Sequence, residues 1–309
     1  MTPLKATEIY GNWATLLLPL NIDDSINYSQ LEEEIDTLIA FKVDGIYSNG
    51  TAGEFYNQTE EEFDLINALL AKKCNAAGMP FQIGASHMSP EISLQRVQRA
   101  RSLKPSAIQV ILPDWFVPTI EEIIVFLKVM AKAADPIGLI LYNPPHAKKK
   151  LSPADFLDIL QAGVPLAGCK VAGGDVQWYQ DMQELPVPFS VFIPGHHLAT
   201  GISRGAHGAY SNVACLNPAF AQKWYNDIHI GDKTAFELET RIQRFMNECI
   251  VPYITDQGYA NQAVDKFMAA VGGWTPISPR LRWPYRWIPE EDVPAIRKKC
   301  KEILPEVFN

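Results

Sequence analysis

Short runs of apolar and β-branched residues alternate with longer amphipathic stretches along most of the chain. The short runs have the length of buried strands, and the longer stretches repeat apolar residues at the spacing of a helix face. Capping signals mark helix starts, such as Thr59 before three glutamates and Ser152 before a proline. The predicted strands are Trp13–Leu18, Gly45–Ser48, Phe81–Ala85, Ala107–Leu112, Gly138–Tyr142, Leu166–Val171, Ser190–Ile193 and Gly208–Tyr210.

Amphipathic helices are predicted between these strands, and their order decides the fold. Strands that alternate with helices indicate parallel pairing through helical crossovers, in a closed barrel or an open doubly wound sheet. Eight units in roughly 230 residues favour the barrel, and no GxGxxG follows the first strand. We therefore predict an α/β protein with a (β/α)8 TIM barrel over residues 1–232. The predicted helices of this part include Tyr28–Phe41, Glu60–Ala77, Ser89–Ser102, Ile120–Ala134, Ser152–Gln161 and Pro218–Ile230.

After the eighth strand the pattern becomes wholly helical. Residues 233–309 are predicted to form a C-terminal helical segment packed on the barrel, with helices at Thr234–Ile250, Asn261–Val271 and Glu290–Ile303. The stretch Gly272–Trp287 contains three prolines and is predicted to be an ordered crossing loop.

Composition and charge narrow the class of protein. The 309 residues are 47% hydrophobic and 20% charged, with a net charge of −8 and one short basic run, Lys148–Lys150. This balance disfavours nucleic-acid binding. Five scattered cysteines without a CxxC pair indicate a reducing compartment rather than disulfides or a zinc ribbon. No apolar run approaches the roughly 18 residues that span a membrane, and no secretory signal is evident. We expect a soluble, cytoplasmic protein.

One charged residue stands out in the sixth strand. Lys170 lies in the run LAGCKVA, which has little else that is polar. Strict alternation places Ala167, Cys169 and Val171 on one face and Lys170 on the other. Inside a barrel the lysine would be desolvated, and the lower pKa of its amine would free it to attack a carbonyl group. Pointing outward, it would lie between helices with its amine in solvent.

Two further segments follow strands whose carboxyl ends would share the barrel mouth. The second strand leads into SNGTAGEF, where Gly50 and Gly53 flank Thr51 and Ala52. Such a loop lets backbone N–H groups converge on an anion such as a carboxylate, or it is simply a glycine-rich turn before a helix. The fifth strand ends in LILYNPPH, which places Tyr142 at the mouth or in a packed, hydrogen-bonded position.

Together these features resemble the dihydrodipicolinate synthase/N-acetylneuraminate lyase superfamily of class I aldolases. The resemblance rests on GTxGE after the second strand, YN-x-P after the fifth and GxK at the end of the sixth. Similar segments are LPDWFVPT, GAHGAYSNVACLNP and NQAVDKFMAAVGG, so the order of motifs is matched over nearly the whole chain.

The resemblance implies roles for these residues. Lys170 resembles the lysine that forms an imine with pyruvate or another 2-keto acid, and Tyr142 the tyrosine that shuttles protons. Thr51 resembles the threonine that relays protons to this tyrosine, and the backbone N–H groups of Thr51 and Ala52 resemble the carboxylate-binding pair next to Gly50. Tyr210, in the motif around the eighth strand, is a further candidate for substrate contact. The resemblance implies no cofactor, and a homo-dimer or homo-tetramer.

The residues expected to bind the second substrate differ from those of a true dihydrodipicolinate synthase. Ala52 replaces a second hydroxyl residue, and Trp115 falls where the family places a tyrosine from a subunit interface. An arginine that holds a distal carboxylate is replaced at His146 or Ala147, neither of which offers a bidentate guanidinium. Lys148 is the neighbouring cation that could reach the same group. Lysine biosynthesis is therefore not the expected role.

Two pairs of residues add candidates for the second substrate. His196 and His197 follow the seventh strand and could contact a polyol or amino sugar. A metal is not expected there, because adjacent histidines on an extended segment point in opposite directions and no carboxylate-rich motif accompanies them. Trp115 and Phe116 would form an apolar wall for an aromatic substrate or a subunit contact.

The leading hypothesis is a lyase or aldolase that forms a Schiff base between Lys170 and a 2-keto acid, with an aldehyde as a possible second substrate. A keto-deoxy sugar acid dehydratase and an aromatic hydratase-aldolase use the same imine. A hypothesis of another class is a barrel that binds a keto acid without catalysis, as a binding or regulatory protein.

Overall fold

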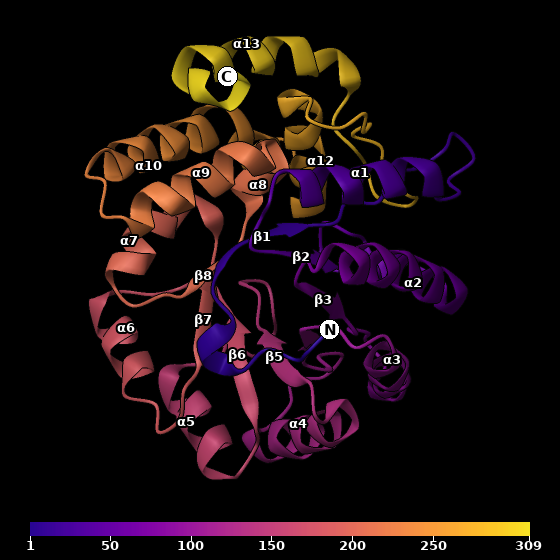
Figure 1. The fold of residues 1–309 in the computed structure, drawn as a ribbon, viewed down its shortest axis with the longest axis vertical. Helices are drawn as coiled ribbons and strands as arrows, with labels where there is room; N and C mark the ends of the chain where they lie inside the picture. The colour runs from indigo at the N-terminus through magenta and orange to yellow at the C-terminus, as the bar shows by residue number, and fades with distance from the viewer.

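The computed structural model describes all residues, 1–309, and contains a closed barrel of eight parallel strands (Figure 1). Each strand pairs with the next in sequence, and β8 pairs with β1. The predicted TIM barrel is confirmed. The strands are β1 (Gly11–Thr15), β2 (Gly45–Ser48), β3 (Phe81–Gly84), β4 (Ala107–Ile111), β5 (Gly138–Tyr142), β6 (Leu166–Lys170), β7 (Ser190–Ile193) and β8 (Gly208–Tyr210).

Helices surround the barrel in the order that the sequence predicts, and their starts follow the capping signals. Thr59 and Ser152 each form a capping box with the acidic residue three positions later. Three short helices, α6, α7 and α8, were not predicted, because five to eight residues are too few for a clear amphipathic period. The helices are α1 (Tyr28–Ala40), α2 (Glu60–Ala77), α3 (Pro90–Ser102), α4 (Ile120–Ala134), α5 (Pro153–Gln161), α6 (Val176–Gln183), α7 (Leu198–Ser203), α8 (Asn212–Leu216) and α9 (Pro218–His229).

The side-chain alternation predicted for β6 is wrong at one position. The ladder between β5 and β6 shifts register, so that Leu139 pairs with Leu166 but Ile140 pairs with Gly168. Ala167 is thereby left without a partner, as in a β-bulge, and packs in the cluster inside the barrel around Trp13. Cys169 and Val171 pack in the main core instead. The bulge therefore fixes which side of the strand carries each later residue, Lys170 included.

The C-terminal segment packs around one side of the barrel, where Figure 1 shows α10, α12 and α13 next to α1 and α9. α12 packs against α8, and α13 packs against α10 and α12. The main hydrophobic core is continuous from Ala14 to Val307, so the segment shares the barrel's core. Its helices are α10 (Thr234–Phe245), continued by a π-helical turn at Met246–Ile250, then α11 (Val251–Thr255), α12 (Asn261–Gly272) and α13 (Val293–Ile303).

The proline-containing stretch before α13 is held in place by two arginines. Arg280 forms an ion pair with Asp24, at 2.6 Å, and Arg282 forms one with Glu62, at 2.8 Å. These contacts join the stretch to the loop before α1 and to the first turn of α2. It is the ordered crossing loop that the sequence predicts.

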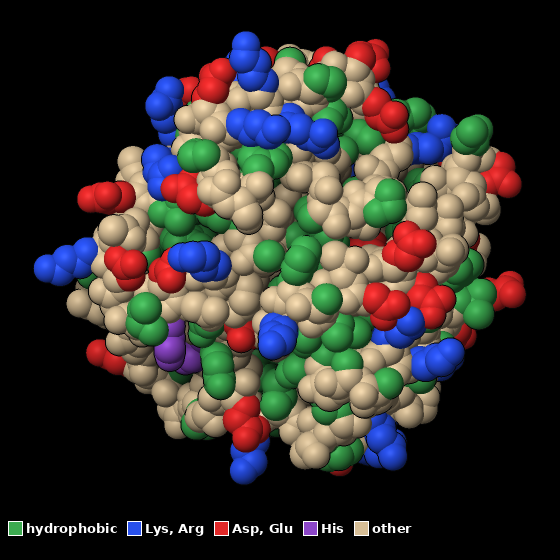
Figure 2. Space-filling model, turned by 45° about the horizontal axis from the view of Figure 1, so that its top comes forward, with side chains coloured by type: hydrophobic (Ala, Val, Ile, Leu, Met, Phe, Trp, Pro, Cys, Tyr) green, Lys and Arg blue, Asp and Glu red, His purple; other side chains and the backbone are tan.

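The surface mixes both signs of charge. On the face in Figure 2, lysine and arginine side chains are interspersed with acidic ones. All five cysteines are buried as free thiols. No helix of the structure is both long and apolar enough to cross a membrane.

Candidate active site

A cavity of about 420 Å³ opens where the strands end. Tyr142, Lys170 and Tyr210 are the last residues of β5, β6 and β8, and all three line it. This is the end of a TIM barrel at which active sites are built. The full lining is Thr15, Tyr47, Thr51, Ala52, Tyr142, Pro145, His146, Lys170, Val171, Ala172, Pro194, His196, Tyr210, Ser211, Asn212, Cys215, Asn261 and Asp265.

Lys170 points into this cavity and lacks a carboxylate partner. The only hydrogen bond of its side chain is from Nζ to the Tyr47 hydroxyl, at 3.2 Å. Nζ lies 4.3 Å from the centre of the Tyr142 ring and 5.4 Å from that of Tyr210. Burial lowers the pKa of the lysine to about 8, although the negative charge of Asp265 acts in the opposite direction. A substantial share of the amine is therefore neutral near physiological pH and is nucleophilic.

Tyr142 is positioned for proton transfer beside the amine. Its hydroxyl lies 3.4 Å from the Thr51 hydroxyl, which comes from the loop after β2. Burial raises the pKa of Tyr142, so the phenol stays protonated and can donate and return a proton. The structure thus brings together the lysine, the tyrosine and the threonine that the resemblance implies.

The loop after β2 presents unused backbone donors at the same cavity. The N–H groups of Gly53 and Glu54 bond to the carbonyl oxygens of Gly50 and Thr51, whereas those of Thr51 and Ala52 have no protein partner. Two adjacent free N–H groups suit a carboxylate. Gly50 does not line the cavity; it packs against the Tyr47 ring, where an added Cβ would lie 2.5 Å from a ring carbon.

A buried ion pair anchors the end of this loop. Glu54 and Lys266 are both fully buried, with Oε1 and Nζ 2.8 Å apart. The other carboxylate oxygen of Glu54 accepts from the N–H of Arg282, and Nζ of Lys266 donates to the Arg280 carbonyl. The loop after β2 is thereby fixed to α12 and to the crossing loop.

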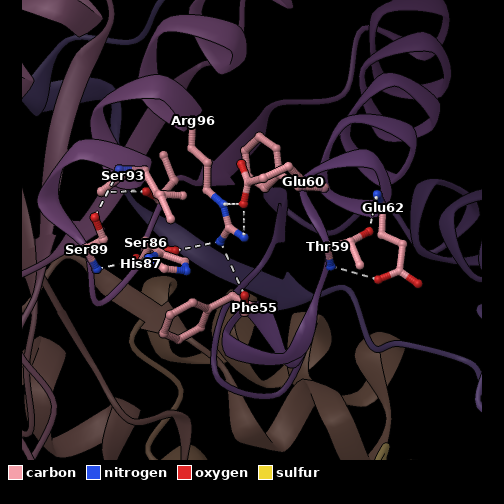
Figure 3. A network of polar contacts seen from close by, with 12 residues as sticks. Phe55, Thr59, Glu60, Glu62, Ser86, His87, Ser89, Ser93 and Arg96 are labelled. Atoms are coloured by element: carbon pink, nitrogen blue, oxygen red, sulfur yellow. Dashed lines mark hydrogen bonds and ion pairs between the residues drawn. The ribbon is translucent and has the colours of Figure 1, made fainter.

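A second buried cation holds the segment that follows this loop, as Figure 3 shows. Arg96 of α3 is fully buried and pairs with Glu60, at 2.7 Å. Its Nη1 atom donates to the carbonyl oxygens of Ser86 and Phe55, at 2.7 and 3.3 Å. The segment that follows Glu54 is therefore tied to α3 and to the loop after β3, which restrains the loop after β2.

His196 lies in the cavity wall, but not as the sequence predicted. Gly195–His197 forms a 3₁₀ turn rather than an extended segment, so the rings of His196 and His197 lie side by side, 4.1 Å apart. Burial lowers the pKa of His196 to about 4, and its Nδ1 atom lies 2.8 Å from the Asn212 amide. His196 is thus a neutral polar group at physiological pH. Nowhere does the structure bring together three His, Cys, Asp or Glu residues that could hold a metal ion.

Two residues proposed from the sequence take different places. His146 lines the cavity, as predicted. Trp115 does not, because it lies in a separate apolar groove together with Phe116 and Val125. The Lys148 amine donates to the Trp115 carbonyl, at 2.6 Å, and is held away from the cavity. Within one chain, therefore, Lys148 does not take the place of the arginine that the resemblance implies.

Sequence reasoning missed Asp265, the one carboxylate of the cavity. It lies on α12, 7% exposed, next to Lys266. The signal was available, because Asp265 and Lys266 are charged residues in an otherwise mostly apolar helix. Tyr47 and Asn212 were missed as well, since neither lies in a distinctive motif.

Fold and site define a class of protein, a TIM barrel with a partly buried lysine that has no ion-pair partner at the carboxyl ends of its strands. The model of the dihydrodipicolinate synthetase family matches residues 8–302, and the chain belongs to that family. The 4-hydroxy-tetrahydrodipicolinate synthase of Coxiella burnetii is 29% identical over 54% of this chain and 57% of its own length. The chain therefore matches little more than half of that relative.

Solved structures show the same fold at low identity. YagE, a prophage protein of Escherichia coli in complex with pyruvate, superposes with a TM-score of 0.83 at 19% identity, over 96% of this chain and 98% of its own. The sialic acid aldolase of Ruminococcus gnavus has a TM-score of 0.82 at 19% identity, over 97% and 98%.

Proposed function

We propose that this protein is a class I lyase or aldolase in which Lys170 forms a Schiff base with pyruvate or another 2-keto acid. The observation that carries the proposal is the partly buried Lys170 amine, which faces a cavity without an ion-pair partner and whose pKa desolvation lowers to about 8. An amine held this way is suited to nucleophilic attack on a ketone. The family membership and the pyruvate bound to YagE support a keto acid as the substrate.

The keto acid carboxylate would bind at the free N–H groups of Thr51 and Ala52. This places its carbonyl carbon toward Lys170, whose amine adds to it to give a carbinolamine. Tyr142 donates a proton to the departing hydroxyl, which leaves as water while the nitrogen lone pair forms the C=N bond and the iminium keeps its N–H. A solvent proton passed through the Thr51 hydroxyl restores the Tyr142 phenol. Protonated, the imine accepts electrons from the neighbouring carbon, which allows a carbon–carbon bond to be made or broken. None of these steps requires a metal or an organic cofactor.

The experiment is borohydride reduction in the presence of pyruvate, followed by the mass of the intact protein. We expect one reduced pyruvate adduct on the wild type and none on Lys170→Ala. An absent adduct on the wild type, or an unchanged adduct on the variant, would overturn the proposal. Trapping without turnover over a panel of aldehydes and sugar acids would instead favour a keto-acid-binding or regulatory protein.

Two other reactions share the imine. A keto-deoxy sugar acid dehydratase would release water instead of an aldehyde. A hydratase-aldolase for aromatic substrates is suggested by the relative of that activity from Sphingobium xenophagum, a trans-O-hydroxybenzylidenepyruvate hydratase-aldolase 24% identical over half of this chain. Product analysis by NMR after cleavage separates the three outcomes.

We also propose that the chain forms a homo-dimer or homo-tetramer through the groove around Trp115. Trp115 and Phe116 are 71% and 81% exposed, and Val125 continues the apolar surface on α4. An exposed apolar patch of this kind usually marks a protein contact. Trp115→Glu should lower the molar mass seen by light scattering, whereas the same change at the exposed Ile22 should not.

A further inference from the structure

Asp265 is a buried carboxylate that the fold does not account for. Its one polar contact is a long hydrogen bond from the Asn261 amide, at 3.4 Å, within the same helix. No lysine or arginine forms an ion pair with it, although its neighbour Lys266 is fully paired with Glu54. Burial of a carboxylate without partners is unfavourable, so an unpaired one in a ligand-sized cavity indicates chemistry rather than stability.

The negative charge of Asp265 shifts the pKa values of the ionisable groups around the cavity. Its charge raises the pKa values of Lys170, Tyr142, Tyr47 and Cys215. Burial raises the pKa of Asp265 itself to about 7, and the Lys170 cation counteracts this shift. Near neutral pH the carboxyl can therefore both accept and return a proton.

The remaining lining restricts what can lie beside Asp265. No arginine lines the cavity, and Lys170, its only lysine, is consumed when the imine forms. The other polar groups there are hydroxyls and amides, such as Thr15 and Asn212, the Cys215 thiol, and the imidazoles of His146 and the neutral His196. A second carboxylate on the substrate would meet the Asp265 charge without a lysine or arginine to balance it. Hydroxyl groups, by contrast, can donate to the carboxylate and accept from the amides.

We propose that Asp265 is the acid–base residue for the hydroxyl-bearing carbon of the second substrate, and that the cavity selects a neutral polyhydroxylated chain over one that ends in a carboxylate. This deepens the proposed function and rests on the Lys170 imine. Tyr142 would serve imine formation, and Asp265 the bond-breaking step.

The cleavage step balances with the groups present. In the imine of a 2-keto-4-hydroxy acid, Asp265 takes the proton of the C4 hydroxyl. The C3–C4 bond breaks as C4 becomes an aldehyde carbonyl, and the electron pair of that bond moves into the iminium to give an enamine. Asp265 returns its proton to C3 after the aldehyde leaves, and water hydrolyses the imine to release pyruvate. Condensation is the reverse.

The test compares two substrates that differ at one end. One is a six-carbon 2-keto-3-deoxy acid that ends in CH₂OH, and the other is its counterpart that ends in a carboxylate. The rate at which each is cleaved is measured for the wild type, Asp265→Asn and Asp256→Asn. Asp256 is exposed, so the last variant makes the same chemical change away from the cavity. We expect the wild type and Asp256→Asn to prefer the neutral chain at least roughly tenfold in kcat/KM.

In Asp265→Asn, cleavage of the neutral chain should fall about 100-fold or more, and the preference should shrink. Pyruvate trapping shows whether this variant still forms the imine. The pH midpoint of trapping should move below that of the wild type, because removal of the Asp265 charge lowers the pKa of Lys170 further. Cleavage that is lost while the imine still forms is the result that a merely structural aspartate would not give.

The outcomes separate the two proposals. No adduct on the wild type would overturn the imine itself. A normal adduct with equal cleavage rates and preference in the wild type and Asp265→Asn would overturn the role of Asp265 alone. A wild type that prefers the carboxylate-ended chain, or that cleaves only an aromatic 4-hydroxy-2-keto acid, would overturn the substrate class.

Discussion

Two lysines inside the fold, Lys266 fully buried and Lys170 partly buried, have opposite surroundings. Lys266 is fully buried, pairs with Glu54 at 2.8 Å and donates to the Arg280 carbonyl. The Lys170 amine donates its one hydrogen bond to a phenol hydroxyl, lies beside tyrosine rings and faces a cavity. Burial lowers the pKa of both, but Glu54 offsets the effect at Lys266. A buried lysine with a carboxylate partner holds structure together, whereas one without a partner is available for reaction.

Removing the reactive lysine should give the largest effect on activity. Lys170→Met should lose pyruvate trapping and lower kcat/KM by roughly 10⁴-fold or more, since no other amine in the cavity can form the imine. The variant should remain folded. Its melting temperature at pH 7 should rise by about 2 °C or more, because the fold no longer has to bury an amine that prefers to be charged. Scanning calorimetry tests this, and a lower melting temperature would contradict the interpretation.

Removing the paired lysine should instead reduce stability. Lys266→Met leaves the Glu54 carboxylate buried without its cation, which should cost about 3–5 kcal/mol in the free energy of unfolding. Urea denaturation measures the loss. The double variant Lys266→Met with Glu54→Gln should recover part of it, because the uncompensated charge is gone. If the single variant lost less than about 1 kcal/mol in the free energy of unfolding, the pair would contribute no more than an exposed ion pair does.

The tyrosine next to the reactive lysine should affect rate more than binding. Tyr142→Phe removes the proton shuttle but keeps the ring beside Nζ. Turnover should fall about 100-fold or more, while pyruvate is still trapped, only more slowly. A Tyr142→Phe enzyme with wild-type turnover would show that the proton comes from another group.

The smallest effect is a pH dependence that only one of the two lysines should produce. The folded-state pKa of Lys170 is depressed to about 8, so the neutral amine is scarce below this value and dominant above it. The initial rate of pyruvate trapping should rise roughly tenfold per pH unit up to about pH 8 and then level off. Lys266→Ala, if it folds at low temperature, should keep this midpoint. A midpoint near pH 10 would mean that the amine is solvated.

Most of the barrel could be predicted from the sequence, because each strand is a short apolar run between capped helices. The exceptions have physical causes. β1 ends at Thr15 rather than Leu18, because the Leu16 N–H still bonds to the Tyr47 carbonyl but the Leu17 N–H donates to the Glu34 carboxylate instead of to a strand. The bulge at Ala167 depends on the register between β5 and β6, which no local pattern specifies.

The candidate site was predictable where residues end strands and not where a distant helix supplies them. Lys170, Tyr142 and Thr51 could be placed because the carboxyl ends of parallel strands share one rim. Asp265 could not be placed, since its position depends on how α12 packs against α8. Trp115 was expected near the substrate from the resemblance, yet within one chain it faces a different groove.

The Glu54–Lys266 pair also has a consequence for how the chain matures. The two residues are 212 positions apart, and every strand of the barrel lies before Lys266 in the sequence. A chain emerging from the ribosome therefore acquires its reactive lysine well before it can neutralise Glu54. We expect the cavity around Lys170 to be assembled last, when α12 docks, so that a shortened chain would contain Lys170 without the complete cavity around it.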